Sequence, residues 1–531
     1  MDKRGKLELT WVGKYEEEKL EPRILIEDKS KSYGDEKTEN MLIYGDNLLA
    51  LKALECDYAG KIKCIYIDPP YNTGSAFESY DDNLEHSIWL NMMKQRLLLL
   101  WNLLCEENGV LLISVNDDEC HYLKVLCDEL FGRSKFIASL VWNYEGNTDN
   151  TAKIINYHEY ILVYSKTGII DDPSVIDPNI SPDSKLFNEE IRNTIIKNGI
   201  KNPPVKVLIP KGFPCSFEKG KIKASDVQYP EYSEDICVEN GVTQNDVFAI
   251  TGWSSRALLE EFIEKGCSTV LDSKGQSTVF EMKNTGAIEA VKKRESKKGH
   301  FISVLRGFGT TNQMRLMLDK MGLKFSYPKP VNLIKYLVEA FSSENDIILD
   351  SFAGSGTTAH AVLELNKEKS GNRKFILVEM EHENVHQVII PRINYVIDGC
   401  EAASINSQGG GYKFYELAEP LLVKNSVLPV YQINSSYTWE MVCEAICKIE
   451  GFAYDPEGEF QGYSSENRFI HITEEFVNTK YVMSVMKTLG ERQSLLIYCK
   501  KNQADMMLPE NVEIKKIPKD LLQKCTFESE V

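Results

Sequence analysis

No long hydrophobic run occurs in the sequence, and this absence argues against a membrane protein. A membrane-spanning helix needs about 18 or more consecutive apolar residues, and no segment reaches that length. Residues 1–6 are mostly charged and no apolar segment follows them, so we expect no secretory signal. With 43% hydrophobic residues among 531, the chain has ample apolar content for about two to four domains. We therefore predict a cytoplasmic protein.

The sequence also lacks a disulfide framework and a metal-binding cluster. The 13 cysteines are odd in number and scattered, and most of them lie inside apolar segments. Cys443 and Cys447 are four residues apart, but no further cysteine or histidine completes a zinc site. No internal repeat is evident. We expect reduced thiols and no bound metal.

Positive charge is scarce, because 61 lysines and arginines face 79 acidic residues and the net charge is −18. This balance argues against a chain coated for nucleic acid, although phosphate contact needs only a local basic face. Two basic blocks do occur in the middle of the chain, and they are either solvated surface or contacts to DNA phosphates. For the second alternative, the predicted DNA-binding residues are Lys206, Lys211, Lys219, Lys221, Lys223, Lys293 and Arg294.

Apolar strands alternate with amphipathic helices in two separate parts of the chain. In the first part, strands are predicted at residues 41–44, 64–67, 110–115, 136–142 and 160–164. In the second part, the pattern predicts helices at 333–341 and 359–366 and strands at 346–349 and 374–378. Strands with continuous apolar cores that alternate with helices are typical of a parallel, doubly wound α/β sheet. The segment between the parts, 168–325, is rich in proline and weakly periodic.

The strand at 64–67 is followed by an unusual group, Asp68-Pro69-Pro70-Tyr71. The two prolines make the turn rigid and remove two backbone donors, and a strand end is the usual place for a ligand crevice in such a sheet. An acid, rigid carbonyls and an aromatic ring suit a planar substrate that forms hydrogen bonds, such as a nucleobase. An ordinary Pro-Pro turn is the alternative.

A second group follows the strand at 346–349 and contains a glycine-rich turn before a helix. Gly354 and Gly356 allow a ligand to approach the backbone closely. Glu379 ends the next strand, where a carboxylate can accept hydrogen bonds from both hydroxyls of a ribose. The turn also satisfies a relaxed fingerprint for NAD, but it is not a phosphate-binding P-loop, because no lysine follows. The Asp68 turn favours a methyl donor over nicotinamide.

These motifs carry a resemblance to a known family. Asp68-Pro69-Pro70-Tyr71 is similar to the catalytic signature of DNA methyltransferases that modify amino groups. Together with Gly45-Asp46-Asn47 and residues 352–358, it resembles the β-class adenine methyltransferases, above all the modification (Mod) subunits of type III restriction–modification systems. The resemblance covers roughly residues 7–165 and 325–400.

The resemblance implies a circularly permuted, Rossmann-like methyltransferase sheet that is doubly wound and uses S-adenosyl-L-methionine. It also implies an inserted target-recognition domain, and a small C-terminal α/β domain is predicted beyond the sheet. The predicted parts are an N-terminal arm (1–40), a catalytic half (41–167), the target-recognition domain (168–325), a donor-binding half (326–411) and the C-terminal domain (412–531).

Individual site residues are carried over by motif. The catalytic residues are predicted to be Asp68, Pro69, Pro70 and Tyr71. Those that bind the methyl donor are predicted to be Asp46, Asn72, Lys329, Pro330, Asp350, Phe352, Ala353, Gly354, Ser355, Gly356, Thr357 and Glu379. Within this set, Lys329 is expected to contact the carboxylate of the donor and Tyr71 to stack on the substrate base.

The implied activity is methyl transfer from S-adenosylmethionine to adenine N6 in double-stranded DNA, after the base has flipped out of the helix. The implied partners are a second copy of the chain and a separate restriction (Res) subunit with ATPase and nuclease activity, in a prokaryotic cell close to the nucleoid. Three alternatives stay open: methylation of cytosine N4, methylation of RNA or a protein amide, and a non-catalytic DNA-binding or scaffold subunit.

Overall fold

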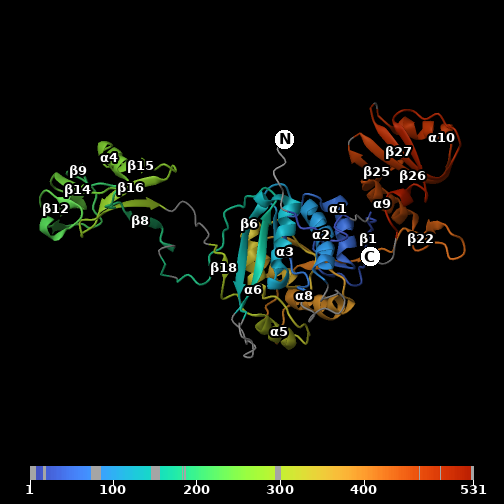
Figure 1. Ribbon diagram of the computed structural model, residues 1–531, viewed down its shortest axis with the longest axis horizontal. Helices are drawn as coiled ribbons and strands as arrows, with labels where there is room; N and C mark the ends of the chain where they lie inside the picture. The colour runs from blue at the N-terminus through green and yellow to red at the C-terminus, as the bar shows by residue number, and fades with distance from the viewer. Residues whose placement is uncertain are drawn as a thin grey trace. The chain divides into compact units, whose positions relative to one another are not determined.

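The computed structural model describes residues 8–15, 19–72, 85–144, 156–181, 183–184, 187–293, 301–465, 467–490 and 492–527. It divides into two compact units, one of Met1–Pro178 with Gly299–Val531 and one of Asn179–Lys298, which is green in Figure 1. The second unit is shorter than the predicted insertion of 168–325. Residues after it return to the first unit, where β18 (Val304–Leu305) pairs with the main sheet and α5 (Thr311–Lys320) follows.

In the described residues, the first unit is built on one sheet of 11 strands. Their order is β1 (Leu25–Glu27), β21 (Gly411–Leu417), β3 (Met41–Tyr44), β20 (Lys374–Glu379), β19 (Ile347–Asp350), β4 (Cys64–Ile67), β5 (Val110–Val115), β7 (His158–Ser165), β6 (Phe136–Asn143) and β18, while β2 (Tyr33–Gly34) pairs with β21. The strands from β21 to β5 are parallel, but β7 is antiparallel to both of its neighbours. The expectation of a wholly parallel sheet was therefore wrong, because apolar strands covered on both faces look alike in either direction.

Two predicted boundaries also change at the edge of this sheet. Residues 412–417, which were predicted to begin the C-terminal domain, belong to β21, and β21 pairs with β3. Residues of the predicted N-terminal arm form β1 and β2, which pair with β21 on its other side. The catalytic sheet therefore gains strands from the segments that precede and follow its predicted bounds in the sequence.

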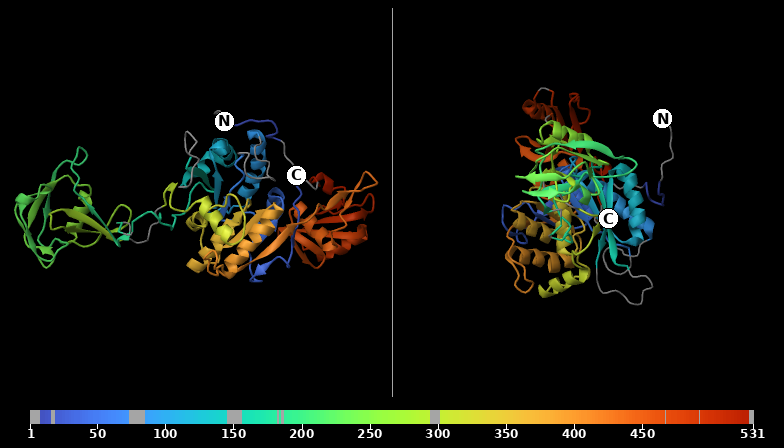
Figure 2. Two further views of the ribbon diagram at one scale, coloured as in Figure 1. Left: turned by 90° about the horizontal axis from the view of Figure 1, so that it is seen from below. Right: turned by 90° about the vertical axis from the view of Figure 1, so that its left-hand side faces the viewer.

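Helices cover both faces of the sheet and give three layers. One face carries α1 (Asn47–Tyr58), α2 (His86–Leu103) and α3 (Asp117–Cys127), and the other carries α6 (Val331–Phe341), α7 (Thr357–Lys369) and α8 (Ile390–Asp398). The blue helices of the first half and the orange ones of the second lie on opposite sides of the strands (Figure 2). Each face has its own apolar core, which is why the strands read as uninterrupted apolar runs.

The second unit consists of short antiparallel strands around a core of its own. Its sheets have the orders β10-β12-β13, β11-β14-β9 and β15-β16-β17-β8. The strands are β8 (Glu190–Thr194), β9 (Val205–Ile209), β10 (Gly220–Ile222), β11 (Glu231–Tyr232), β12 (Ile236–Glu239), β13 (Val242–Thr243), β14 (Val247–Thr251), β15 (Val270–Leu271), β16 (Ser277–Met282) and β17 (Ile288–Lys293), with one helix, α4 (Arg256–Glu264). Phe213, Phe262 and Phe280 are fully buried and pack edge to face. Short strands with alternate burial explain the weak periodicity of this segment.

The C-terminal part forms a smaller α/β layer. After β22 (Leu422–Lys424), β23 (Tyr431–Ile433) and α9 (Trp439–Glu450) comes a sheet of β24 (Ala453–Glu457), β25 (Phe460–Ser465), β26 (Arg468–Val477), β27 (Ser494–Asn502) and β28 (Val512–Lys516), with α10 (Thr479–Val485) between β26 and β27. Across the described part of the chain, no helix has the length and apolar character needed to cross a membrane. The same part contains no group of three or more metal-ligating side chains.

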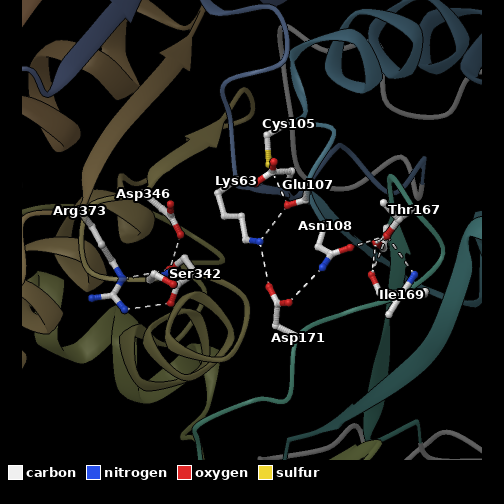
Figure 3. A network of polar contacts seen from close by, with 12 residues as sticks. Lys63, Cys105, Glu107, Asn108, Thr167, Ile169, Asp171, Ser342, Asp346 and Arg373 are labelled. Carbon is white, nitrogen blue, oxygen red and sulfur yellow. Dashed lines mark hydrogen bonds and ion pairs between the residues drawn. The ribbon is translucent and has the colours of Figure 1, made fainter.

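At the amino end of the central strands, a polar network holds the segment that follows β7 (Figure 3). Lys63, just before β4, donates to the Glu107 carbonyl and pairs with Asp171, each at 3.1 Å. Asn108, just before β5, donates to the other oxygen of Asp171 at 3.0 Å. The network therefore ties together three loops at the end of the sheet opposite the predicted site.

Candidate active site

The predicted site residues follow three neighbouring parallel strands. Asp68 comes directly after β4, Asp350 ends β19 and Glu379 ends β20. Because β19 lies between β4 and β20 in register, the carboxyl ends of the three strands meet at one edge. The sheet therefore brings together the two halves of the chain that the inserted unit separates in sequence.

A cavity opens at this edge, and most of the predicted residues line it. The predicted residues on its wall are Asp68, Pro70, Lys329, Asp350, Phe352, Ala353, Gly354, Ser355, Thr357 and Glu379. Five further residues line the cavity but were not predicted from the sequence: Tyr66, Phe325, Tyr327, Thr358 and Asn384. Phe325 and Tyr327 stand four and two residues before Lys329. Aromatic residues so close to a predicted ligand contact were the signal in the sequence that could have identified them.

Six predicted residues lie outside the lining of this cavity: Asp46, Pro69, Tyr71, Asn72, Pro330 and Gly356. Asp46 caps α1, accepting from the Leu49 amide at 3.0 Å, and pairs with Arg96 at 3.3 Å. Asn72 has a left-handed backbone, with φ of 61°, and donates to Glu119 at 2.7 Å. Asp46 and Asn72 therefore make structural contacts, and their contacts to the donor stay predictions.

Asp68 is held by two partners, one on each carboxylate oxygen. The Tyr71 hydroxyl donates to Oδ1 at 2.7 Å, and the Lys329 ammonium pairs with Oδ2 at 2.8 Å. The same ammonium donates to the Tyr71 hydroxyl at 2.9 Å and lies 4.9 Å from the centre of its ring. Asp68, Tyr71 and Lys329 thus form one closed cluster that joins the two halves of the chain.

A second carboxylate, Glu159, completes this cluster and was not predicted. Its Oε2 lies 3.0 Å from the Tyr71 hydroxyl and 3.3 Å from the Lys329 ammonium. Glu159 is near the beginning of β7, and because β7 runs antiparallel, its beginning lies at the carboxyl edge of the parallel strands. The wrong expectation of a parallel β7 would have placed Glu159 at the opposite edge.

Electrostatics shift the pKa values of this cluster. Burial alone lowers the pKa of Lys329, but the nearby carboxylates of Asp68 and Glu159 outweigh it, so the pKa is raised and the ammonium stays charged. Burial and the same two carboxylates raise the pKa of Tyr71 well above its usual value. The phenol is therefore protonated and can serve as a hydrogen-bond donor.

Two further carboxyl groups of the cavity are buried. Burial raises the pKa of both Asp350 and Glu379 to about 7, although each accepts hydrogen bonds. Asp350 accepts from the Thr358 hydroxyl at 2.5 Å, and Glu379 accepts from the Gly354 amide at 2.7 Å. Carboxylates with pKa values displaced by burial are common where a polar ligand binds.

The glycine-rich turn lies between these carboxylates and depends on its glycines. Gly354 and Gly356 have φ of +52° and +76°, in the left-handed region. A Cβ on Gly354 would lie 3.3 Å from the ring of Phe325, which also lines the cavity. Arg392, fully buried, supports the turn from behind by donating to the Ser355 carbonyl at 2.9 Å and the Thr357 hydroxyl at 3.0 Å. Its role was not visible in the sequence.

The predicted DNA-binding residues all belong to the second unit. Those that lie in described segments, Lys206, Lys211, Lys219, Lys221, Lys223 and Lys293, are exposed, whereas Arg294 lies outside the described residues. Lys219 pairs with Glu239 and Lys221 with Asp235, each at 2.9 Å. The ammonium of Lys206 lies 3.7 Å from the centre of the Phe248 ring. Two of these lysines are thus already neutralised by acids.

Comparison with known proteins identifies the family. A family model described as DNA methylase matches residues 62–389, more than half of the chain. The chain belongs to the DNA methylase family. The predicted resemblance to DNA methyltransferases is confirmed, and S-adenosyl-L-methionine is the methyl donor of this family.

Individual relatives of this DNA methylase are Mod subunits of type III restriction–modification enzymes. The EcoPI Mod subunit of Escherichia phage P1 is 30% identical over 465 residues, which are 76% of this chain and 70% of that protein. The StyLTI Mod subunit of Salmonella typhimurium is 28% identical, over 73% of this chain and 61% of that protein. The EcoP15I Mod subunit of Escherichia coli is 24% identical, over 78% of this chain and 72% of that protein.

The residues of the cavity fit S-adenosylmethionine. The left-handed turn at Gly354 leaves room that a side chain would fill, and buried carboxylates are suited to accept from ribose hydroxyls. Aromatic rings from Phe325, Tyr327 and Phe352 add apolar surface for a purine.

Proposed function

We propose that this DNA methylase modifies adenine N6 in double-stranded DNA as the Mod subunit of a type III restriction–modification system. The observation that carries the proposal is the position of Asp68, which lines the donor cavity and directly follows β4, the strand beside β19. Similarity to three Mod subunits supports it. Within the family that this chain resembles, an aspartate rather than a serine at position 68 of the motif Asp68-Pro69-Pro70-Tyr71 favours adenine over cytosine.

The amino group of adenine needs activation, because its lone pair is delocalised into the ring. Asp68 and the Pro69 carbonyl accept its two hydrogens, which draws the nitrogen towards tetrahedral geometry and directs the lone pair into the cavity. S-adenosylmethionine, when bound, supplies an electrophilic methyl group on its sulfonium centre. Most of the rate enhancement then comes from positioning and electrostatic complementarity.

Donor binding falls to the other half of the chain. Glu379 accepts from the ribose hydroxyls, and the turn of residues 353–357 holds the methionine part. Lys329 was predicted to contact the carboxylate of the donor, but its ammonium pairs with Asp68 and Glu159. The proposed main role of Lys329 is therefore at the substrate end of the cavity.

Base flipping and partners complete the proposal. The target adenine leaves the duplex at a cost of a few kcal/mol, part of which is recovered by stacking on Tyr71. The second unit contacts DNA phosphates through its exposed lysines. The chain acts with a separate Res subunit, because the related proteins are named as Mod subunits of restriction–modification enzymes. A homodimer is part of the same proposal.

A methyl-transfer assay tests the proposed function. Purified protein is incubated with duplex DNA and donor labelled in the methyl group, and the DNA is digested to nucleosides. The expected labelled product is N6-methyladenosine in its deoxy form. Labelled N4-methylcytosine would contradict the choice of base, and label on the protein or on RNA alone would contradict the whole proposal.

A salt-dependence experiment tests the DNA-binding surface. Lys206, Lys211 and Lys223 form no ion pair with a described acid, and we expect their replacement by glutamine to weaken binding to all sequences equally. Each lost phosphate contact should lower the slope of log K against log salt by about 0.9. Replacement of Lys219 and Lys221 is the matched control, because these lysines already pair with acids. Equal slopes in the wild type and the triple variant would contradict DNA contact.

A further inference from the structure

The cluster around Lys329 contains one more acid than the proposed reaction uses. Asp68 and Glu159 share the Lys329 ammonium, at 2.8 and 3.3 Å, and share the Tyr71 hydroxyl, at 2.7 and 3.0 Å. The exposed fractions of the side chains are 9% for Lys329, 17% for Glu159 and 23% for Asp68. Burying charged groups this close together costs free energy unless the carboxylates are well positioned relative to the ammonium.

We infer that Glu159 is a positioning residue for Asp68, acting through the lysine and the tyrosine that the two carboxylates share. The inference rests on the proposed function, since it assigns Asp68 to the substrate amino group. Glu159 does not line the donor cavity. Its influence on the reaction therefore passes through Lys329 and Tyr71.

Because Lys329 pairs with Glu159 as well as with Asp68, Asp68 remains a strong hydrogen-bond acceptor. A lysine paired with Asp68 alone would neutralise the charge of Asp68, leaving a weaker acceptor for the substrate amino group. With Glu159 present, the ammonium is divided between two carboxylates, and the cluster of Asp68, Glu159 and Lys329 keeps a net charge of −1. Such a charge stabilises the positive charge that develops on the attacking amino nitrogen.

Orientation is the second contribution of Glu159. The Tyr71 hydroxyl has a single proton and lies within hydrogen-bond distance of both carboxylates. Lys329 donates to the same oxygen, and its carbonyl accepts from the Thr357 hydroxyl at 3.3 Å. Glu159 therefore fixes the phenol and the ammonium from the side of β7, while Thr357 links Lys329 to the donor-binding turn.

Other ionisable groups also face the cluster. Asp350 approaches from β19, Tyr66 from β4 and Tyr144 from the residue after β6. Each of the three remains in every variant used below. Changes between variants therefore report on Glu159, Lys329 and Asp68.

The first experiment measures methyl transfer by Glu159→Gln, with Asp171→Asn at the other end of the sheet as the matched control. We expect kcat to fall about 10-fold, the effect of losing roughly 1.4 kcal/mol of stabilisation, while donor affinity by calorimetry stays within twofold. The control should keep the wild-type kcat. A weakened donor affinity with unchanged kcat would overturn the inference.

A stability measurement gives a readout that does not depend on activity. Lys329→Met leaves two carboxylates without their cation, so its Tm should fall. Adding Glu159→Gln should restore part of the lost Tm, because only one carboxylate then remains. A double variant whose Tm loss equals the sum of the single losses would overturn the inference. Absence of DNA methylation by the wild type would instead count against the proposed function.

Discussion

Each end of the main sheet contains a lysine bound to acidic side chains, and the two clusters differ in their surroundings. At the amino end, Lys63 pairs with Asp171, whose side chain is 68% exposed (Figure 3). At the carboxyl end, Lys329 pairs with Asp68 and Glu159, whose side chains are 23% and 17% exposed. Water screens the first pair and is largely excluded from the second.

The difference separates a structural network from a reactive one. Lys63 lowers the pKa of Asp171 by a hydrogen bond, which is the ordinary result for an exposed ion pair. At the carboxyl end, burial and neighbouring charge instead raise the pKa values of Tyr71, Asp350 and Glu379. The comparison indicates that the exposed ion pair has a structural role, whereas the groups from which water is largely excluded have the shifted pKa values of a reactive site.

The largest expected effect is at Asp68. Replacement of Asp68 by alanine should lower kcat by at least about 100-fold, because a key hydrogen bond in the transition state is removed. Donor binding by calorimetry and Tm should change little. Retention of more than about 10% of the wild-type rate would contradict the role of Asp68.

Tyr71 should show a smaller but clear effect. From the sequence, stacking was expected to be the main contribution, which predicts a nearly active Tyr71→Phe variant. Since the hydroxyl contacts Asp68, Glu159 and Lys329, we expect Tyr71→Phe to lose about 10-fold in kcat and Tyr71→Ala to lose more. Single-turnover kinetics would measure both. Full activity of Tyr71→Phe would mean that Tyr71 contributes to kcat by stacking alone.

Glu379 links the site to stability. Its pKa of about 7 lies above the ordinary 4.5, so the folded protein binds more protons than the unfolded chain between these values. Stability of the donor-free protein should therefore fall as pH rises from about 4.5 to 7. Glu379→Gln should be more stable than the wild type at pH 8, by on the order of 1–3 kcal/mol, and should lose this advantage in acid. Denaturant titrations at several pH values would measure it, and an equal pH dependence in both proteins would contradict the raised pKa.

The smallest effect is expected at the amino end. Asp171→Ala removes an exposed ion pair and should lower the free energy of unfolding by less than about 1 kcal/mol. Methyl transfer should stay at the wild-type rate, since Asp171 lies at the other end of the strands. A loss of activity comparable to that of Glu159→Gln would remove the distinction between the two ends.

The order of helices and strands and the main site motifs could be read from the sequence. The strand at 41–44 was predicted with the bounds of β3, and the glycine turn was placed correctly between β19 and α7. These features depend on local patterns of apolar residues, glycine and proline. The family resemblance rests on the same local motifs, and the match to the DNA methylase family confirms it.

The partners of each strand were decided only by the tertiary structure. The pairing of β19 with β4 brings Asp350 and Asp68 to one cavity, although the inserted unit separates them in the chain. The reversed direction of β7 brings Glu159 to Lys329. Strand direction and neighbour order depend on contacts between distant segments, and buried apolar strands carry no local signal for either.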